Sequence, residues 1–478
     1  MKNVIRYIIG GFSLLLIGAV VFLTVFLQFY TKGHLYSENY PMQSFTNVVV
    51  SEDHQNYYDY GFLVRSGHSS NRCGYISKYD NNDNMIKNML IDDVDSQNQM
   101  TEPTFLYEKD SFLFVAVSTM TDNSRTMSIL KLNKDDLSVI ERNELDWYLE
   151  DVGVYDADES GFLFSNLHST VSVIKIIKTD FEGNILNSVE IPNQIRLDFL
   201  DYDYILSTLP PEANGIDTEA ILTGSKVKLY EDKIYFCGTI ARKGAYENKH
   251  TGVVMCFDNS GNVIWRNDKT PIYLESKSVE NISRYNDIYI DGKKIFIVGS
   301  EGKYRYDSDL PEKEKGTMLT PVIDEYDLNG NFIISNLFEN KNKSSGFDKI
   351  LKTNDGFLLL GWPRSENTIG GYSIHQNRKV NDLILNAIIN KNAGFYTQVI
   401  DNKIIGRVWD SKTGLSTLKV YKNYQQFSQT QNFLSFLRGV QNYQARIIVI
   451  LSIIAIFYFL PLVKQLFTNR KRKAGEPT

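Results

Sequence analysis

Oxygen-bearing side chains alternate along one short segment of the chain. Asp156, Asp158 and Ser160 match the first half of a calcium-binding loop, and a glycine follows where such a loop turns sharply. The ninth and twelfth positions are Phe164 and Leu167, so the later ligands, including the bidentate glutamate, are missing. We therefore expect a turn between two strands here, with calcium bound by the three oxygen-bearing residues as the weaker alternative. No other cofactor is expected.

Three cysteines are too few for a scaffold stapled by disulfides. Cys237 and Cys256 nevertheless lie on two predicted strands joined by a loop centred near Ala245 and Tyr246. A symmetric register would place them opposite each other with Cβ atoms roughly 4.5–5.5 Å apart, which is close to disulfide range. We expect either a disulfide between them or two buried thiols, with Cys73 left over.

Other motifs that carry chemistry are missing from the sequence. The six histidines show no metal-ligand spacing, and no G-x-S-x-G, phosphate-binding or dinucleotide-binding motif is present. With 51 Lys and Arg against 57 Asp and Glu, the formal net charge is −6, which excludes nucleic acid as a partner on bulk charge. We expect no catalytic residues, and the chain is not predicted to be an enzyme.

A repeated phrase organises the chain between its two ends. It runs apolar strand, Asp, two residues, Gly, Asn, apolar strand, and its weaker copies lie around Asp80, Asn133 and Asn390. Asp caps such a turn, while Gly or Asn tolerates the left-handed backbone that a tight hairpin needs. Three copies are clear. Their turn residues are Asp180, Gly183 and Asn184 in the first, Asp258, Gly261 and Asn262 in the second, and Asp327, Gly330 and Asn331 in the third.

A second phrase, an apolar strand led by Gly, Asp or Asn, precedes most of these copies. Examples are YGFLVRSG at 60–67, DKIYFCGT at 232–239 and DGFLLLGW at 355–362. The phrase recurs about seven times, as expected for four-stranded blades of roughly 40–50 residues with loop insertions. We therefore predict an all-β fold, a β-propeller of about seven blades, with six or eight as alternatives. A series of β-sandwiches and a β-helix fit the spacing less well.

The segment GVVMCFDNSGNVIWRND at 252–268 resembles one blade repeat of the quinoprotein-like (PQQ-type) propellers. That repeat runs apolar strand, Asp, turn, Gly, apolar strand, Trp, and Asp258, Gly261 and Trp265 occupy those places here. The other copies have Asn187 or Ser335 near the tryptophan position. The resemblance implies a fold for the region 41–430. The cofactor pocket, adjacent cysteine pair and calcium site of a quinoprotein dehydrogenase are not visible, so it implies no activity.

Both ends of the chain carry long apolar runs. Residues 7–30 contain no charge and exceed the roughly 20 residues that a helix needs to cross a bilayer. The run is too long for the apolar core of a signal peptide, and no cleavage motif follows it. A second apolar run, residues 447–463, lies between Arg446 and a basic tail. Lys and Arg near span ends mark the cytoplasmic side, so the sequence predicts two membrane spans with both termini cytoplasmic.

Strand closure would bring the two spans together. Residues 44–53 are a candidate closing strand, which would place the chain near 45 beside the chain near 425 and let both helices leave the same face. Gly11 and Gly18 lie seven residues apart in the first run, and small residues let helices approach closely. We expect either a helix–helix contact there or ordinary transmembrane glycine usage. The predicted organisation is 1–6 cytoplasmic, 7–30 transmembrane, 31–423 propeller, 424–445 stalk or linker, 446–463 transmembrane, and 464–478 cytoplasmic tail.

These expectations lead to a membrane protein with an extracytoplasmic domain, and the Asn-, Lys-, Ile- and Tyr-rich composition favours a bacterial cell envelope. The leading hypothesis is a non-catalytic binding or scaffold module for an envelope protein, a peptide or a membrane complex. One alternative is an extracytoplasmic enzyme that acts on glycans or peptides through carboxylates of the propeller channel. Another is a ligand-sensing subunit of a membrane complex.

Overall fold

The fold is described from a computed structural model of the full chain. The described residues are 2–31, 42–64, 72–91, 100–121, 125–147, 149, 152–167, 173–192, 194–196, 219–242, 250–269, 279–305, 316–338, 345–363, 374–380, 383–389, 398–400, 403–410 and 415–473. Residues 32–41 of the predicted propeller domain and 474–478 of the predicted tail lie outside them.

Twenty-eight strands and two helices make up the described chain. The helices are α1 (Lys2–Thr31) and α3 (Tyr424–Lys473). The strands are β1 (Met42–Val50), β2 (Asn56–Val64), β3 (Arg72–Asp80), β4 (Met85–Ile91), β5 (Met100–Lys109), β6 (Phe112–Met120), β7 (Arg125–Asn133), β8 (Val139–Glu144), β9 (Gly153–Asp158), β10 (Gly161–Ser165), β11 (Val173–Thr179), β12 (Ile185–Pro192), β13 (Gln194–Arg196), β14 (Glu219–Tyr230), β15 (Lys233–Arg242), β16 (His250–Phe257), β17 (Val263–Asp268), β18 (Val279–Asp291), β19 (Lys294–Arg305), β20 (Gly316–Asp327), β21 (Phe332–Leu337), β22 (Ser345–Thr353), β23 (Gly356–Pro363), β24 (Ile374–Val380), β25 (Leu383–Ile389), β26 (Gln398–Ile400), β27 (Lys403–Asp410) and β28 (Leu415–Tyr421).

The repeated Asp phrase forms the same tight turn in each clear copy. In the turn between β11 and β12, the Asp180 carboxylate accepts hydrogen bonds from the backbone N–H groups of Glu182 at 3.0 Å and Asn184 at 2.8 Å. The Asn184 amide donates to the same carboxylate at 2.8 Å. Gly183 has a φ of +96°, the left-handed region that favours glycine. The turn chemistry expected from sequence is therefore confirmed.

Hydrogen bonding groups the strands into five sheets, so five blades are detected where about seven were predicted. Four sheets have four or five strands, and the fifth has 11 strands. Within that largest sheet, two of the junctions between strands are single residue pairs, Ser44 with Ser416 and Arg72 with Met100. The all-β propeller is confirmed, while the blade number is not.

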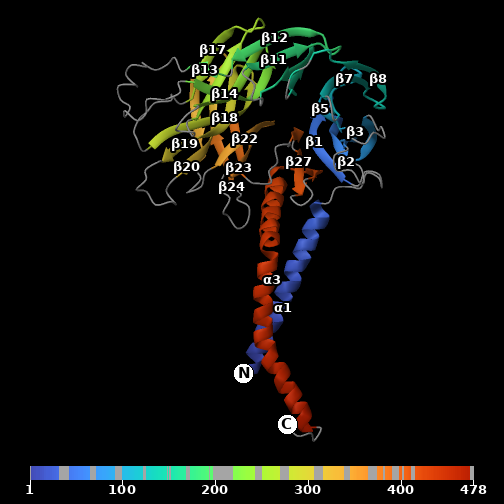
Figure 1. Cartoon of the computed structure of the whole chain (residues 1–478), viewed down its shortest axis with the longest axis vertical. Helices are drawn as coiled ribbons and strands as arrows, with labels where there is room; N and C mark the ends of the chain where they lie inside the picture. Colours follow the sequence, from blue (N-terminus) through green and yellow to red (C-terminus); the bar gives the residue numbers. More distant parts are fainter. Residues whose placement is uncertain are drawn as a thin grey trace.

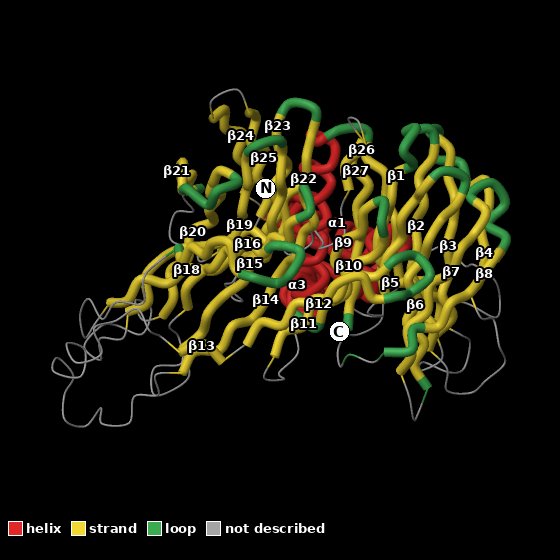
Figure 2. The backbone as a smooth tube through the Cα atoms, turned by 90° about the horizontal axis from the view of Figure 1, so that it is seen from above, coloured by secondary structure: helices red, strands yellow, loops and turns green. Residues whose placement is uncertain are grey.

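The first strand of each repeat lies inside and the last strand outside. Side chains of the last strands β8 and β21 are mostly exposed, those of β10, the second strand of its sheet, are all buried, and those of the first strand β9 are mostly half-buried. The first strands contact one another in the cyclic order β1, β5, β9, β14, β18, β22, β26 and back to β1. Figure 2 shows the sheets following one another around the molecule in this order. We call these first strands the inner strands.

The ring closes between the two ends of the propeller. Strand β1 pairs with β28 at Ser44 and Ser416, and Val48, Tyr57, Ile400 and Ile405 form one apolar cluster across this junction. The prediction that a segment near residue 44 meets the last strands is thereby confirmed. Burial of these apolar side chains stabilises the closed ring.

A β-bulge recurs in six of the inner strands. The register slips by one residue in β1, β5, β9, β14, β18 and β22, each near the middle of the strand. A bulge bends its strand and redirects the next side chains. The residues directly after the bulge include Asp156, Lys226, Asp287 and Lys349, so charged side chains gather on the inner strands.

Helices α1 and α3 extend side by side from the same side of the propeller (Figure 1). Helix α3 begins at Tyr424 and runs without a break through the predicted stalk and the second apolar run. A search of the described residues finds no helix that combines the length and the apolarity needed to cross a bilayer. The two membrane spans therefore stay a prediction from sequence.

Candidate functional site

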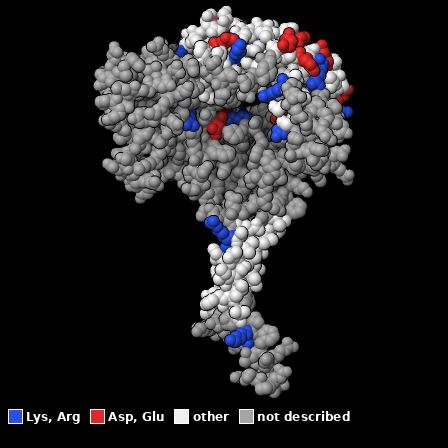
Figure 3. Space-filling view, viewed as in Figure 1, with Lys and Arg blue, Asp and Glu red and all other residues white. Residues whose placement is uncertain are grey.

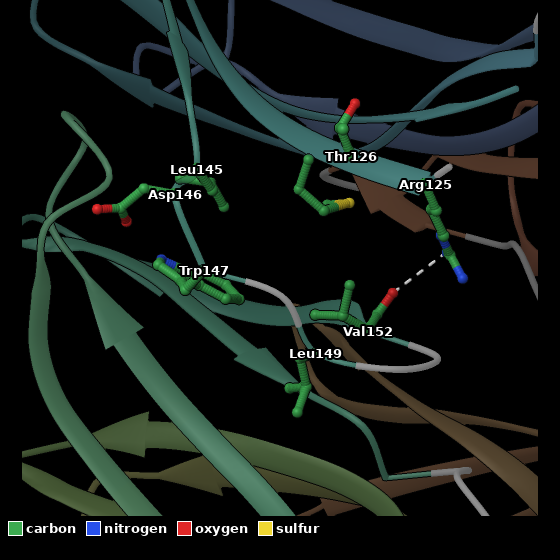
Figure 4. Close-up of a pocket in the computed structure, with 8 residues that line it drawn as sticks. Arg125, Thr126, Leu145, Asp146, Trp147, Leu149 and Val152 are labelled. Carbon is green, nitrogen blue, oxygen red and sulfur yellow. Dashed lines mark hydrogen bonds between the residues drawn. The ribbon is translucent and has the colours of Figure 1, made fainter. Parts of the chain in front are cut away.

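A small pocket opens where the chain leaves β8 for the next sheet (Figure 4). Its volume is about 140 Å³, enough for roughly one side chain of a partner. Buried apolar side chains form part of its wall, and polar groups lie at its edges. The lining residues are Arg125, Thr126, Met127, Leu145, Asp146, Trp147, Leu149 and Val152. We call this the rim pocket.

Two rim-pocket side chains are held in place by their neighbours. The Arg125 guanidinium donates from Nε to Ser118 Oγ at 3.1 Å and from Nη2 to the Val152 carbonyl at 3.3 Å. The Trp147 ring meets Phe164 edge to face, with centroids 5.1 Å apart. A fixed aromatic wall beside a fixed guanidinium suits an apolar side chain flanked by a hydrogen-bond acceptor. Arginine and tryptophan are also common anchors of protein interfaces.

A second group of candidate residues, all of them charged, lies on the inner strands. Lys226 and Lys228 stand two residues apart on β14 and therefore share one face of the strand. Lys349 comes from β22, and the carboxylates of Asp156 on β9 and Asp287 on β18 lie among these cations. We call these five residues the inner charge cluster.

The two carboxylates of the inner charge cluster are already engaged. Asp156 accepts from Lys228 Nζ at 2.9 Å and from the Leu229 backbone N–H at 2.9 Å. Asp287 accepts from the backbone N–H groups of Ile288 at 3.0 Å and Ile350 at 3.1 Å. Both carboxylates therefore tie one inner strand to another or cap their own strand, and they do not form a free acid–base pair.

The three lysines are half-buried by accessible surface, and the partial loss of water dominates their electrostatics. It lowers the pKa of Lys349 to about 8, because the nearby Asp287 does not fully offset the loss of water and the charges of Lys226 and Lys228. Burial and the charge of Lys228 lower the pKa of Lys226. Burial also acts on Lys228, but the ion pair with Asp156 outweighs it and raises that pKa.

The calcium alternative at Asp156, Asp158 and Ser160 is not supported by the contacts of these residues. Asp158 accepts from the Ser160 N–H at 2.8 Å and hydroxyl at 2.6 Å and pairs with Lys178 at 2.8 Å. Asp156 instead reaches Lys228 on another inner strand. The carboxylates thus serve a turn and two ion pairs. Across the described residues, no group of three or more His, Cys, Asp or Glu could hold a metal ion.

The cysteines are not opposed, because the hairpin register differs from the assumed one. Cys237 pairs with Val254, and Cys256 pairs with Tyr235, so the two thiols are offset by two residues. Both thiols are free and buried, and Cys73 is also free. Burial raises the pKa of the thiols of Cys237 and Cys256, which makes both poor nucleophiles.

The glycines predicted to mediate a helix contact do not do so within this chain. A Cβ added at Gly11 or Gly18 would meet no atom within 4 Å. Among the described residues, the buried positions of α1 are instead Gly10 and Ser13, and those of α3 are Ala455 in its apolar run and Phe427 and Ser428 near its start. Small residues do lie between the helices, but on a different face of α1 from the one predicted.

Sequence reasoning missed both the rim pocket and the inner charge cluster. The pocket had no recognisable signal, since Arg125 and Trp147 become neighbours only through the turn after β8. The cluster had a weak signal: Lys226 and Lys228 alternate with Val227 and Leu229, and this period of two is typical of a strand with one polar and one apolar face. Lysines in such a strand need either a partner or water.

Comparisons with known proteins identify no family for this chain and find only weak structural similarity. No protein-family model matches the chain, so the PQQ-type family is not confirmed, and no curated protein matches it. Solved structures resemble it weakly. The propeller of Dos1 has a TM-score of 0.33 at 9% identity, over 66% of this chain and 74% of that one. A puromycin-hydrolyzing peptidase of Mycobacterium tuberculosis has a TM-score of 0.38 at 8% identity, over 81% of this chain and 54% of that one.

An uncharacterized protein of Listeria monocytogenes EGD-e has a TM-score of 0.29 at 11% identity, over 82% of this chain and 97% of that one. Scores this low carry no argument about activity. The assignment of the chain as an all-β propeller therefore rests on its own cyclic order of inner strands and its repeated hairpin turns.

Proposed function

We propose that this protein is a membrane-anchored, extracytoplasmic β-propeller that binds an envelope protein or peptide without catalysing a reaction. The observation that carries the proposal is the apolar outer surface of the paired helices α1 and α3, which extend from one side of the ring. Such a surface is unfavourable in water and suits lipid.

The helix pair has its small residues inside and its large apolar residues outside. Leu15 and Phe22 on α1 are 73% and 67% exposed, and Phe457 and Leu460 on α3 are 72% and 65% exposed. In Figure 3 the described stem is almost entirely uncharged, with Lys or Arg only toward its two ends. The uncharged stretch 447–463 would extend roughly 26 Å as a helix, close to the roughly 30 Å hydrocarbon core.

The ring is best counted as seven blades in this proposal. The two single-pair junctions divide the 11-stranded sheet into β1–β4, β5–β8 and β26–β28, which gives three blades beside the four other sheets. The cyclic order of seven inner strands supports the same count. Neighbouring sheets that share apolar clusters form a rigid disc, and a disc of this kind can present loops to a partner.

The rim pocket supports a binding role. Trp147 and Arg125 are the kinds of side chain that dominate interfaces, and the pocket has room for one anchoring residue of a partner. The enzyme alternative lacks comparable support, because the cluster carboxylates Asp156 and Asp287 are engaged by a lysine and by backbone N–H groups. A sensor would share the same anchors and would need a partner to pass on its signal.

Anchoring can be tested on the full chain in native membranes. We expect the protein to stay in the pellet after an alkaline carbonate wash. Protease added to intact cells should digest the propeller and leave the helices. Release by carbonate, or protection of the propeller while other exposed proteins are cut, would overturn the anchored arrangement.

Binding can be tested by crosslinking in the same membranes, followed by purification of the full chain. We expect a stoichiometric partner that is lost from Trp147→Ala and kept by Phe332→Ala. Phe332 is a matched control because it is an exposed aromatic residue on β21, outside the rim pocket. A partner retained equally by both variants would refute the rim pocket as its site, and the lack of any stoichiometric partner would count against a scaffold.

A further inference from the structure

The inner charge cluster holds a cation whose charge is not matched by a neighbour. Lys226 has no carboxylate within ion-pair distance among the described residues, and its nearest recorded contact is the Tyr155 ring, 5.8 Å from Nζ to the centroid. Lys228, two residues away, already shares Asp156. The Lys226 ammonium therefore lies beside the ion pair of Lys228 with Asp156. Both are on the inner strands, where the propeller excludes part of the water.

The nearby acidic groups cannot neutralise Lys226 without giving up other bonds. Asp287 accepts from two backbone N–H groups that would lose their partner if it moved. Asp156 likewise accepts from Lys228 Nζ and from the Leu229 N–H, both at 2.9 Å. The carboxylates of the cluster are thus fixed by the strands, while in the described part of the chain the Lys226 ammonium lies near the face of the Tyr155 ring and outside ion-pair distance of any carboxylate.

The lysines come from strands that the bulges bring together. β14 contacts both β9 and β18, and β18 contacts β22. The two aspartates that follow a bulge reach the next inner strand, Asp156 at the Leu229 N–H and Asp287 at the Ile350 N–H. Lys226 instead lies near Tyr155 on the preceding inner strand. Lys226 and Lys228 on β14 and Lys349 on β22 thus lie on the two strands that flank β18, and the two β14 charges help to lower the pKa of Lys349.

We propose that Lys226, Lys228 and Lys349 form a binding site for a small oxyanion, either a phosphate or a carboxylate group. Such a group would accept hydrogen bonds from two or more ammonium groups and offset their burial. It would also link β14 to β22 and so hold non-adjacent parts of the ring together. This site is separate from the rim pocket and does not depend on the membrane anchor.

The test uses the purified full chain in detergent at pH 7, with ionic strength held constant by sodium chloride. Sodium phosphate and sodium acetate are titrated separately while the melting temperature is followed by tryptophan fluorescence. We expect a saturable rise in the melting temperature, because a ligand that binds only the folded state stabilises it. The probe with the lower half-saturating concentration identifies the preferred group.

Variants separate a site from a general salt effect. Lys226→Met should raise the half-saturating concentration about tenfold or more, and Lys226→Arg should keep the response because it keeps the charge. Lys175→Met is the matched control, since Lys175 lies on β11 and pairs with Glu190 at 2.6 Å, outside the inner charge cluster. Line broadening of the phosphorus resonance of added phosphate gives a second readout.

The sign of the effect without added oxyanion is a further check. If the site is built to bind an oxyanion, Lys226→Met removes a half-buried cation that has no ion-pair partner among the described residues, and it should raise the melting temperature in chloride alone. If Lys226 merely stabilises the ring, the same change lowers it, and that result would overturn the proposal. No saturable response to either probe, or an unchanged response in Lys226→Met, would also overturn it.

Discussion

Two fully buried aspartates, Asp59 and Asp324, meet different surroundings in the same ring. Each accepts a hydrogen bond from a tyrosine hydroxyl, from Tyr75 at 3.3 Å and from Tyr285 at 2.5 Å. Asp324 also meets a cation, Lys269, whose Nζ lies 2.7 Å from the carboxylate, whereas no described Lys or Arg forms an ion pair with Asp59. Lys269 follows β17, so the cation comes from the sheet next to the one that contains Asp324.

The comparison shows that groups from the neighbouring blade determine how far a buried carboxylate destabilises the folded protein. Around Asp324 the network is complete, since Lys269 also pairs with Glu301 at 2.9 Å and the Tyr285 hydroxyl bonds that of Tyr326 at 2.7 Å. For Asp59, one carboxylate oxygen has no hydrogen-bond partner among the described residues. Burial accordingly raises the pKa of Asp59 to about 7.

Removing the charge of Asp324 should have the largest effect on stability. Asp324→Asn leaves Lys269 with less compensation and disrupts the tyrosine hydrogen bonds. We expect the free energy of unfolding to fall by about 4 kcal/mol at pH 7. Urea unfolding of the full chain in detergent measures the change, and Asp59→Asn is the matched control. A loss below about 1 kcal/mol would mean that the ion pair does not stabilise the ring.

At high pH, Asp59→Asn should raise the free energy of unfolding, whereas Asp324→Asn lowers it. The folded pKa of Asp59 lies above its unfolded value of 3.8, so the stabilising contribution is fully present below about pH 4 and is lost as the pH rises through about 7. The shift corresponds to roughly 4 kcal/mol. We expect Asp59→Asn to stabilise the protein by about 2 kcal/mol at pH 8.

As the pH falls from 8 to 4, the unchanged protein should gain roughly 4 kcal/mol relative to Asp59→Asn, so the variant's advantage of about 2 kcal/mol at pH 8 should become a deficit of about 2 kcal/mol at pH 4. Urea unfolding at several pH values measures this. A difference that stays constant with pH would show that Asp59 does not titrate in this range, and the contrast with Asp324 would then fail.

A double-mutant cycle sharpens the role of the cation. Lys269→Met and Asp324→Asn should each destabilise the protein, but the pair of changes should cost less than their sum by about 2 kcal/mol. The coupling arises because each change removes the partner of the other. Additive losses, measured by the same unfolding experiment, would show that Lys269 acts mainly through Glu301.

The tyrosine hydroxyls should show the smallest effects. Tyr285→Phe removes a short hydrogen bond to a carboxylate and should cost about 2 kcal/mol. Tyr75→Phe removes a longer hydrogen bond and should cost about 1 kcal/mol at pH 8. Thermal unfolding of both variants compares them directly. Equal losses would indicate that hydrogen-bond length does not separate the two sites.

Local sequence determined the hairpins. The Asp180, Gly183 and Asn184 pattern specifies its turn because every hydrogen bond in it joins residues at most four apart. The apolar runs likewise predicted the strands of a propeller. The apolar segment 44–53, just before the first repeat, predicted the strand that closes the ring. These features depend on nearest neighbours and on composition, which a sequence contains in full.

Only the tertiary structure decided which side chains meet. The register that separates Cys237 from Cys256 depends on where the loop folds back, and the contact of Lys269 with Asp324 depends on how one sheet packs on the next. The bulges directly before Lys226 and Lys349 could not be predicted from the neighbouring sequence. They arise where the inner strands bend to close the ring. Contacts between blades are therefore consequences of packing rather than of any single segment.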